Sequence, residues 1–166
     1  MFRAYLAYLN AFQIGFVAGM RSLTAPALVS HKLSNMHPEP LVGSKLHFLT
    51  SSKTATALKA LAGAELIGDK VPNVPDRIEP QPLSMRVASG ATCGAALSET
   101  EGKSAKIGAV VGGLGAAAGA YTFFYIRQWL TMKRDLPDPA VALAEDALAI
   151  TIGWLTVDAL EVPQRA

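Results

Sequence analysis

The side chains best suited to do chemistry are charged residues inside or beside apolar stretches. Glu65 and Asp69 are four residues apart, so a helix places both carboxylates on one face. Glu145 and Asp146 form a second acidic pair in an apolar segment. A carboxylate near lipid must be paired, protonated or hydrated. We therefore predict a polar membrane site from these acids and the nearby basic residues: Arg21, Glu65, Asp69, Lys70, Arg77, Arg86, Arg127, Glu145 and Asp146.

Two interpretations of this site remain open. In the functional one, the charges lie between helices and bind a cation, a proton or a charged lipid headgroup. In the structural one, they form an ion-pair lattice or lie at helix ends, where Lys70 and Arg127 reach the interface. Arg77 and Arg86 either bind an anion beside a helix N-terminus or meet lipid phosphates at the interface.

Other site chemistry has little support in the sequence. His31, His37 and His47 are irregularly spaced in one polar connection, so we expect solvated loop residues and not a metal site. Cys93 is the single cysteine, which excludes an intrachain disulfide and a CxxC motif. The GGLGAAAG of residues 112–119 has no strand before it and is not a dinucleotide-binding turn. We predict no catalytic residue, no metal and no cofactor.

Composition leaves two protein classes open. The chain has 166 residues, 51% of them hydrophobic and 17% charged, with a net charge of +2. We expect one domain over residues 1–166, and this apolar content excludes general disorder. The small basic excess argues against nucleic-acid binding. An Ala-rich soluble helical domain and a small polytopic membrane protein both remain.

The segment at residues 107–126, IGAVVGGLGAAAGAYTFFYI, favours the membrane protein. Its twenty residues carry no charge and would form a helix of ~30 Å, the thickness of a bilayer core. Glycines recur on one stripe of this helix, which costs about 1 kcal/mol each in water but permits close helix packing in lipid. The apolar stretches at residues 4–29 and 87–97 repeat the pattern, and residues 1–20 are interpreted as a retained helix and not a removed signal. The predicted packing positions are Gly15, Gly19, Gly90, Gly94, Gly108, Gly112, Gly115 and Gly119.

A break is predicted in the first apolar stretch, at the GMRSLTAP of residues 19–26. Pro26 lacks a backbone N–H, so it bends or ends the helix and frees a carbonyl near Ser22. Arg21 at this point needs a partner, a cavity or the interface. We expect the Ser22 and Thr24 hydroxyls to satisfy backbone carbonyls around the break, not to act as nucleophiles.

The remaining segments are shorter or more polar. Residues 54–68 predict a helix of only ~22 Å. Four prolines predict an extended loop over residues 71–82, and residues 87–97 are expected to be re-entrant or buried. A last helix is predicted over residues 139–160, with Asp138 as its N-cap.

Short segments in the two halves of the chain are weakly similar, which suggests an internal duplication. The GxxxG of residues 15–19 matches that of residues 115–119, and AGAE at 62–65 matches ALAE at 142–145. Chance similarity between Ala-rich helices is the alternative. A true duplication implies the inverted-repeat plan of many transporters. The half-repeats would be residues 1–82 and 83–166.

Several segments together resemble a known family. They are GFVAGMRSLTAPA at 15–27, AELIGDKVPNVPDRIEP at 64–80, Arg86 with Gly90, and ALAEDALAI at 142–150. The chain resembles a widespread group of small bacterial integral membrane proteins catalogued as a domain of unknown function. The resemblance implies a helical membrane fold and assigns no catalytic residue.

We therefore predict an all-α, polytopic helical membrane protein with four to five membrane-embedded helices, in the bacterial inner membrane. The leading functional hypothesis is a transporter or channel for a small charged solute or lipid headgroup. One alternative is an accessory or assembly subunit of a membrane complex; a second is a lipid-headgroup-modifying enzyme that uses a metal, although a non-enzyme is favoured. The expected partners are membrane lipids, further copies of the chain or a larger membrane complex, and no nucleic acid.

Overall fold

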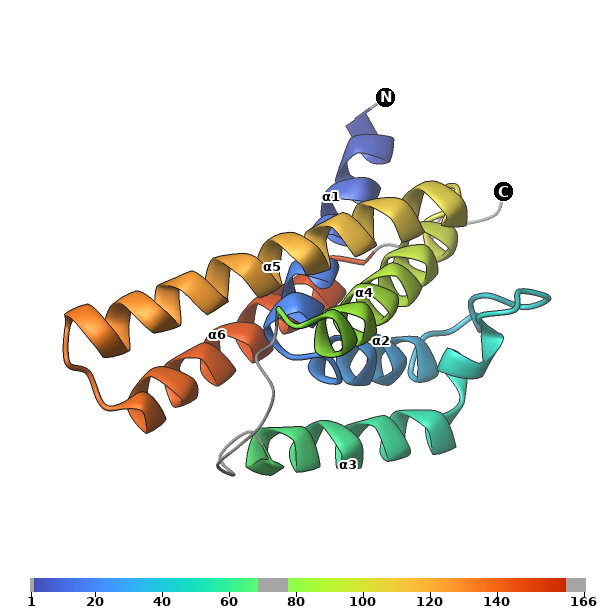
Figure 1. Cartoon of the computed structure of the whole chain (residues 1–166). Helices are drawn as coiled ribbons and strands as arrows, with labels where there is room; N and C mark the ends of the chain where they lie inside the picture. Colours follow the sequence, from blue (N-terminus) through green and yellow to red (C-terminus); the bar gives the residue numbers. More distant parts are fainter. Residues whose placement is uncertain (1, 69–77, 161–166) are drawn as a thin grey trace.

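The computed structural model describes residues 2–68 and 78–160, and over these residues the chain is helical with no strand. The all-α prediction is therefore confirmed. In order, the elements are α1 (Phe2–Met20), α2 (Thr24–Ser34), the 3-10 helix η1 (His47–Thr50), α3 (Ser52–Gly68), α4 (Pro80–Thr100), α5 (Ala105–Lys133) and α6 (Asp138–Asp158) (Figure 1).

Helices α1, α4 and α5 form the centre of the fold, and they touch through backbone atoms. A Cβ on Gly15 of α1 would overlap the carbonyl group of Gly112 in α5. A Cβ on Gly94 of α4 would overlap the carbonyl oxygen of Gly108 in α5. At all eight glycines singled out from the sequence, an added Cβ would lie closer than 3.0 Å to a neighbouring atom. Only glycine fits these crossings without moving a helix.

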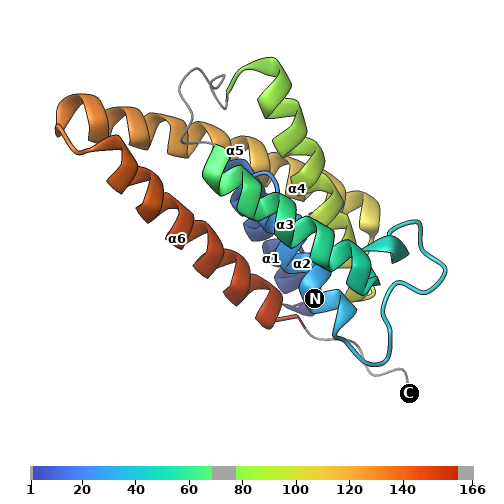
Figure 2. The ribbon, with the colours of Figure 1, turned by 90° about the horizontal axis from the view of Figure 1, so that it is seen from below.

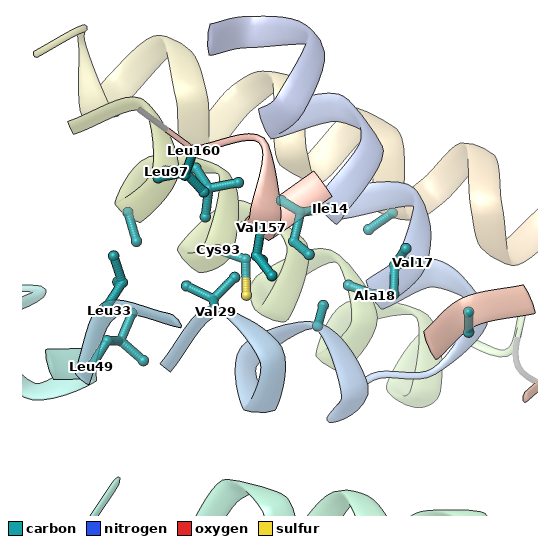
Figure 3. Close-up of a cluster of buried hydrophobic side chains, with 14 of the residues drawn as sticks. Ile14, Val17, Ala18, Val29, Leu33, Leu49, Cys93, Leu97, Val157 and Leu160 are labelled. Atoms are coloured by element: carbon teal, nitrogen blue, oxygen red, sulfur yellow. The ribbon is translucent and has the colours of Figure 1, made fainter. Parts of the chain in front are cut away.

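Apolar side chains from α1, α2, η1, α4, α5 and α6 form a buried core. Figure 3 shows this apolar cluster, which joins α2 and the end of α6 to α1 and α4. Its labelled members are Ile14, Val17, Ala18, Val29, Leu33, Leu49, Cys93, Leu97, Val157 and Leu160. Helix α3 packs on α2 and η1, outside this core (Figures 1 and 2).

The predicted break between α1 and α2 is confirmed. Helix α1 ends at Met20, and Pro26 is the third residue of α2, where a missing N–H costs no intrahelical hydrogen bond. The carbonyl oxygen of Ser22, four residues before Pro26, accepts a hydrogen bond from Ser89 Oγ at 2.5 Å. The chain thus changes direction over three residues beside α4.

Helix α4 extends beyond both ends of the predicted segment at residues 87–97, and Gly90 and residues 93–97 within that segment are buried, one of the two expected placements. The helix already begins at Pro80, so Pro80 and Pro82 lie in its first turn and do not belong to an extended loop. Proline is tolerated there because the first N–H groups of a helix have no intrahelical acceptor. The predicted border between half-repeats, at residues 82 and 83, falls inside this turn. Residues 71–77 lie outside the described part of the chain.

Two of the three histidines lie in helices, which corrects the prediction of a solvated loop. His31 lies in α2, where its ring centroid is 5.9 Å from that of Trp154 and its Nδ1 is 2.9 Å from Lys59 Nζ. His47 begins η1, and its Nε2 lies 2.9 Å from Glu39 Oε1. His37 is exposed in the connection between α2 and η1.

Helices α5 and α6 form a hairpin whose closed end projects beyond the other helices in both views (Figures 1 and 2). Helix α6 begins one residue earlier than predicted, with Pro137 and not Asp138 at its N-cap. Within the described residues, α5 and α6 are the two helices long and apolar enough to cross a membrane by length and composition. They give weak support for a membrane location.

Candidate functional site

The break between α1 and α2 is the point where charged side chains from three other helices meet. Arg21 lies in the break, and only 1% of its side chain is exposed. Its Nε lies 2.6 Å from Oδ1 of Asp146, whose side chain is 10% exposed. Asp146 comes near the middle of α6 (Asp138–Asp158). This buried ion pair ties the break to the centre of a candidate membrane-crossing helix.

Arg86 of α4 binds the end of α1. Its Nη1 donates hydrogen bonds to the carbonyl oxygens of Met20 at 2.8 Å and Gly19 at 3.1 Å. The last carbonyls of a helix have no intrahelical donor and carry partial negative charge. The buried guanidinium therefore satisfies these carbonyls and offsets the charge at this helix end.

Glu65 of α3 binds the start of α2. One carboxylate oxygen accepts hydrogen bonds from Ser22 N at 2.8 Å and Ser22 Oγ at 2.6 Å. The other accepts from Leu23 N at 2.8 Å. A carboxylate is favoured here because the N-terminus of a helix carries partial positive charge. Glu65 thus holds the two residues that lead into α2 from a different helix.

The hydroxyl groups around the break have different roles from those predicted. Ser22 Oγ donates to Glu65 and not to a backbone carbonyl. The buried Thr24 Oγ1 has no hydrogen-bond partner within residues 2–68 and 78–160. Ser89, which the sequence analysis missed, supplies the donor for the freed Ser22 carbonyl. Ser89 follows Arg86 by three residues in α4 and therefore lies on the same helical face, which could have identified it as a neighbour of the site.

The other predicted site residues lie elsewhere. Arg127 forms a two-pronged ion pair with Asp138, with Nε to Oδ1 at 2.8 Å and Nη2 to Oδ2 at 2.7 Å. It belongs to the α5–α6 hairpin and not to the break. Glu145 is buried and, like Arg127, lines a groove between these two helices. The predicted site residues Asp69, Lys70 and Arg77 lie outside the described residues.

The break cluster, defined as Arg21, Glu65, Arg86 and Asp146, is electrically balanced. It has two cations and two carboxylates, and each sits where a helix end or an opposite charge favours it. Burying such charges costs free energy unless pairing and hydrogen bonds compensate. The described residues contain no group of three or more His, Cys, Asp or Glu side chains placed to hold a metal ion.

Comparison with known proteins places the chain in a family without assigning it an activity. No curated protein and no solved structure matches it. A family model described as a domain of unknown function, DUF4126, matches residues 9–163. The match includes all four residues of the break cluster and all eight packing glycines. The chain therefore belongs to the family described as a domain of unknown function, DUF4126.

Proposed function

We propose that this protein is a multi-pass membrane protein that moves a small cation or a proton across the bilayer through the break cluster. Four or five of its helices are embedded in the membrane. Helices α5 and α6 cross it, α1 and α4 pack against α5, and α2, which contacts α1, α4 and α6, is the fifth. The observation that carries the proposal is the buried Arg21–Asp146 ion pair, with a 2.6 Å separation, beside the middle of α6.

Two features of the surface support the membrane part of this proposal. Large apolar side chains point outward along both α5 and α6, among them Leu114, Tyr125, Leu143 and Leu155, each more than half exposed. An exposed apolar face of this extent marks a membrane or a protein interface. The glycine contacts give α1 and α4 backbone-to-backbone packing against α5, which is typical of helices in lipid.

The position of the break cluster supports the transport part. Gly19, two residues before Arg21, lies against Ala116, Gly119 and Ala120, which are in the middle third of α5. The break therefore lies beside the middle of both candidate crossing helices. Transporters often place their ion sites at the bilayer midplane, where an interrupted helix presents its two ends. Here Arg86 and Glu65 occupy those two ends.

We propose that Asp146 changes its partner, from Arg21 to the transported cation or proton. Its carboxylate can pair with Arg21 or bind an incoming cation or proton, whereas Glu65 and Arg86 are held by the backbone at the break. An intramembrane carboxylate that changes partner is the usual element of cation and proton pathways. Asp146 is therefore the residue whose charge the proposed flux requires.

A liposome assay tests this proposal. Purified wild-type protein is reconstituted with a trapped pH dye, and proton influx and K⁺ efflux are followed after a gradient is imposed. We expect flux above that of empty liposomes, its loss with Asp146→Asn, and its retention with Asp158→Asn, a matched change at an exposed aspartate of α6. Wild-type flux equal to that of empty liposomes, or full flux with Asp146→Asn, contradicts the proposal.

A second candidate function is an assembly or accessory subunit of a membrane complex. It is favoured by the way in which Glu65 and Arg86 cap the two helix ends, because a purely structural cluster needs no ligand. This candidate predicts no flux in liposomes together with stable co-purification of another membrane protein. Co-purification that disappears when exposed apolar residues of α6, such as Leu143 and Leu155, are changed to Ser would support it.

A further inference from the structure

A groove separates α5 and α6 in the projecting hairpin. The volume of this groove is about 300 Å³. Its walls are almost entirely apolar and include Ile126 and Leu130 of α5 and Val141 and Leu148 of α6, with Arg127 and Glu145 as the charged lining residues. Phe123 lies at its inner end and packs edge-on against Phe16 of α1, with ring centroids 5.9 Å apart. The groove therefore ends against the central helices and lies along the hairpin.

The lining of the groove indicates what can occupy it. Its volume of about 300 Å³ is at the lower limit for small-molecule pockets. A flexible hydrocarbon chain suits walls that are almost entirely apolar.

Basic side chains lie at the closed end of the hairpin, next to the groove. The backbone N–H of Leu136 donates to the Leu130 carbonyl oxygen at 3.2 Å. Between these two lining residues, Lys133 at the end of α5 and Arg134 after it are exposed. Arg134 lies over the Trp129 ring, with its guanidinium carbon 4.7 Å from the ring centroid.

The turn keeps a positive charge after its acidic neighbours are counted. Asp135 in the same turn offsets one of the two basic residues, Lys133 and Arg134. Asp138, the next acid, is held by both prongs of Arg127. One positive charge remains, at the end of a groove between two helices that are apolar enough to span a bilayer. A Trp and basic residues at the end of such a helix are typical of the lipid-headgroup level.

We propose that the α5–α6 groove binds one acyl chain of an anionic phospholipid, whose phosphate lies on Lys133 and Arg134. The site is separate from the break cluster. The inference rests on the membrane location in the proposed function but not on transport, because binding needs no flux. An anionic headgroup is favoured over a zwitterionic one by the positive charge of the turn.

The two tryptophans of the chain allow a direct measurement. Trp154→Phe leaves Trp129, beside the groove residue Leu130, as the single fluorophore. This protein in detergent is titrated with phosphatidylglycerol whose acyl chains carry bromine, which quenches nearby tryptophan. We expect saturable quenching, with half-saturation at about fivefold lower lipid than for brominated phosphatidylcholine, the effect of roughly one basic charge.

Matched variants in the same background locate the chain and the headgroup. Ala144→Phe fills the groove and should weaken quenching at least tenfold, whereas Ala147→Phe, on an exposed part of α6 outside the groove, should not. Changing Lys133 and Arg134 together to Gln should abolish the preference for phosphatidylglycerol. Lys106→Gln, at the other end of α5, should preserve it.

The result that overturns the proposal is equal quenching in the Ala144→Phe and Ala147→Phe proteins, or equal affinity of the wild type for the two lipids. If a second copy of the chain covers the groove instead, the protein will be a dimer that Ala144→Phe dissociates, and quenching by lipid will persist in that variant. This result also rejects the proposal. Should Ala144→Phe fail to fold, native mass spectrometry of the wild type decides. From an equimolar mixture, phosphatidylglycerol should be retained over phosphatidylcholine, and equal retention refutes the site.

Discussion

The individual charged residues around the α1–α2 break are matched to the backbone groups that the break leaves exposed. Arg86 satisfies carbonyl oxygens at the end of α1, and Glu65 accepts from N–H groups at the start of α2. A break in a helix leaves such groups without partners, and in an apolar environment each unpaired group costs several kcal/mol. These side chains therefore allow an interrupted helix to exist inside the fold.

The Arg21–Asp146 pair should show strong energetic coupling. Asp146→Leu leaves the buried Arg21 guanidinium without this carboxylate and should lower the free energy of unfolding by about 3–5 kcal/mol. A double variant, Arg21→Met with Asp146→Leu, should be less destabilised than Asp146→Leu alone, because both charges are removed. Chemical denaturation in detergent micelles measures both. Destabilisation in the double variant equal to the sum of those in Asp146→Leu alone and Arg21→Met alone would show that the pair is not coupled.

The double variant also separates structure from function. If it recovers stability but conducts neither protons nor K⁺ in liposomes, the charges are needed for flux and not for folding. A stable double variant with wild-type flux would instead assign the pair to neither role.

Glu65 should contribute through its hydrogen bonds to the start of α2. Glu65→Gln keeps one carbonyl oxygen but replaces the other acceptor with a donor that faces N–H or O–H groups. We expect a loss of about 1–3 kcal/mol of stability. Thr56→Ala, on an exposed position of the same helix, is the control and should stay within about 0.5 kcal/mol of the wild type. Thermal unfolding in micelles, followed by circular dichroism, compares the two variants. Equal stability of Glu65→Gln and Thr56→Ala would show that the hydrogen bonds of Glu65 do not stabilise the start of α2.

At the scale of helices, the packing depends on glycines whose neighbours are backbone atoms. A Cβ on Gly112 would overlap the carbonyl oxygen of Gly90 and approach the Cα of Gly94. Because backbone atoms cannot rotate away as a side chain does, α4 and α5 would have to separate. The crossing of three helices at one place explains why so many small residues are concentrated there.

A pair of glycine substitutions tests this packing. Gly112→Ala should destabilise the fold by about 1–3 kcal/mol, because the added methyl group overpacks the crossing. Gly63→Ala in α3 meets nothing within 4 Å and should instead stabilise it by about 0.5–1 kcal/mol, since alanine favours the helix. Unfolding curves of both proteins in one detergent give the comparison. An unchanged or raised stability in Gly112→Ala would mean that the helices do not touch as described.

The elements that the sequence predicted well are those with strong local signals. The glycine stripe and the charge-free run identified α5, and Pro26 identified the break after Met20. Helix α4 was misjudged because Pro80 and Pro82 also occur in extended loops. Proline is compatible both with the first turn of a helix and with an extended loop, so the two prolines could not show that α4 begins at Pro80.

The candidate site was predictable as a set of residues but not as a set of pairs. Arg21 and Asp146 were both recognisable because charges are rare in apolar segments, yet 125 positions separate them in the chain. Which carboxylate reaches which arginine depends on how α6 crosses the α1–α2 break. Arg127 shows the same limit, because its partner is Asp138, just before the predicted start of the last helix.

At the scale of the whole molecule, buried charges and outward-facing apolar side chains occur together with the apolar core. Buried charges occupy the middle, around Arg21, while large apolar side chains such as Leu114 and Leu155 point outward. Hydrocarbon around α5 and α6, as we propose, would account for both features, because it favours exposed apolar groups and requires charges to be paired inside. Both proposals, the flux and the lipid site, depend on this environment.

Extraction from membranes is the most direct test of that environment. Membranes from cells that express the full chain are washed with alkaline carbonate, and the pellet is then treated with either plain buffer or a mild detergent. We predict that the protein stays in the pellet through the carbonate wash and in plain buffer, and that detergent releases it. Release by carbonate, followed by a monodisperse peak in detergent-free buffer, would contradict the membrane location on which the account depends.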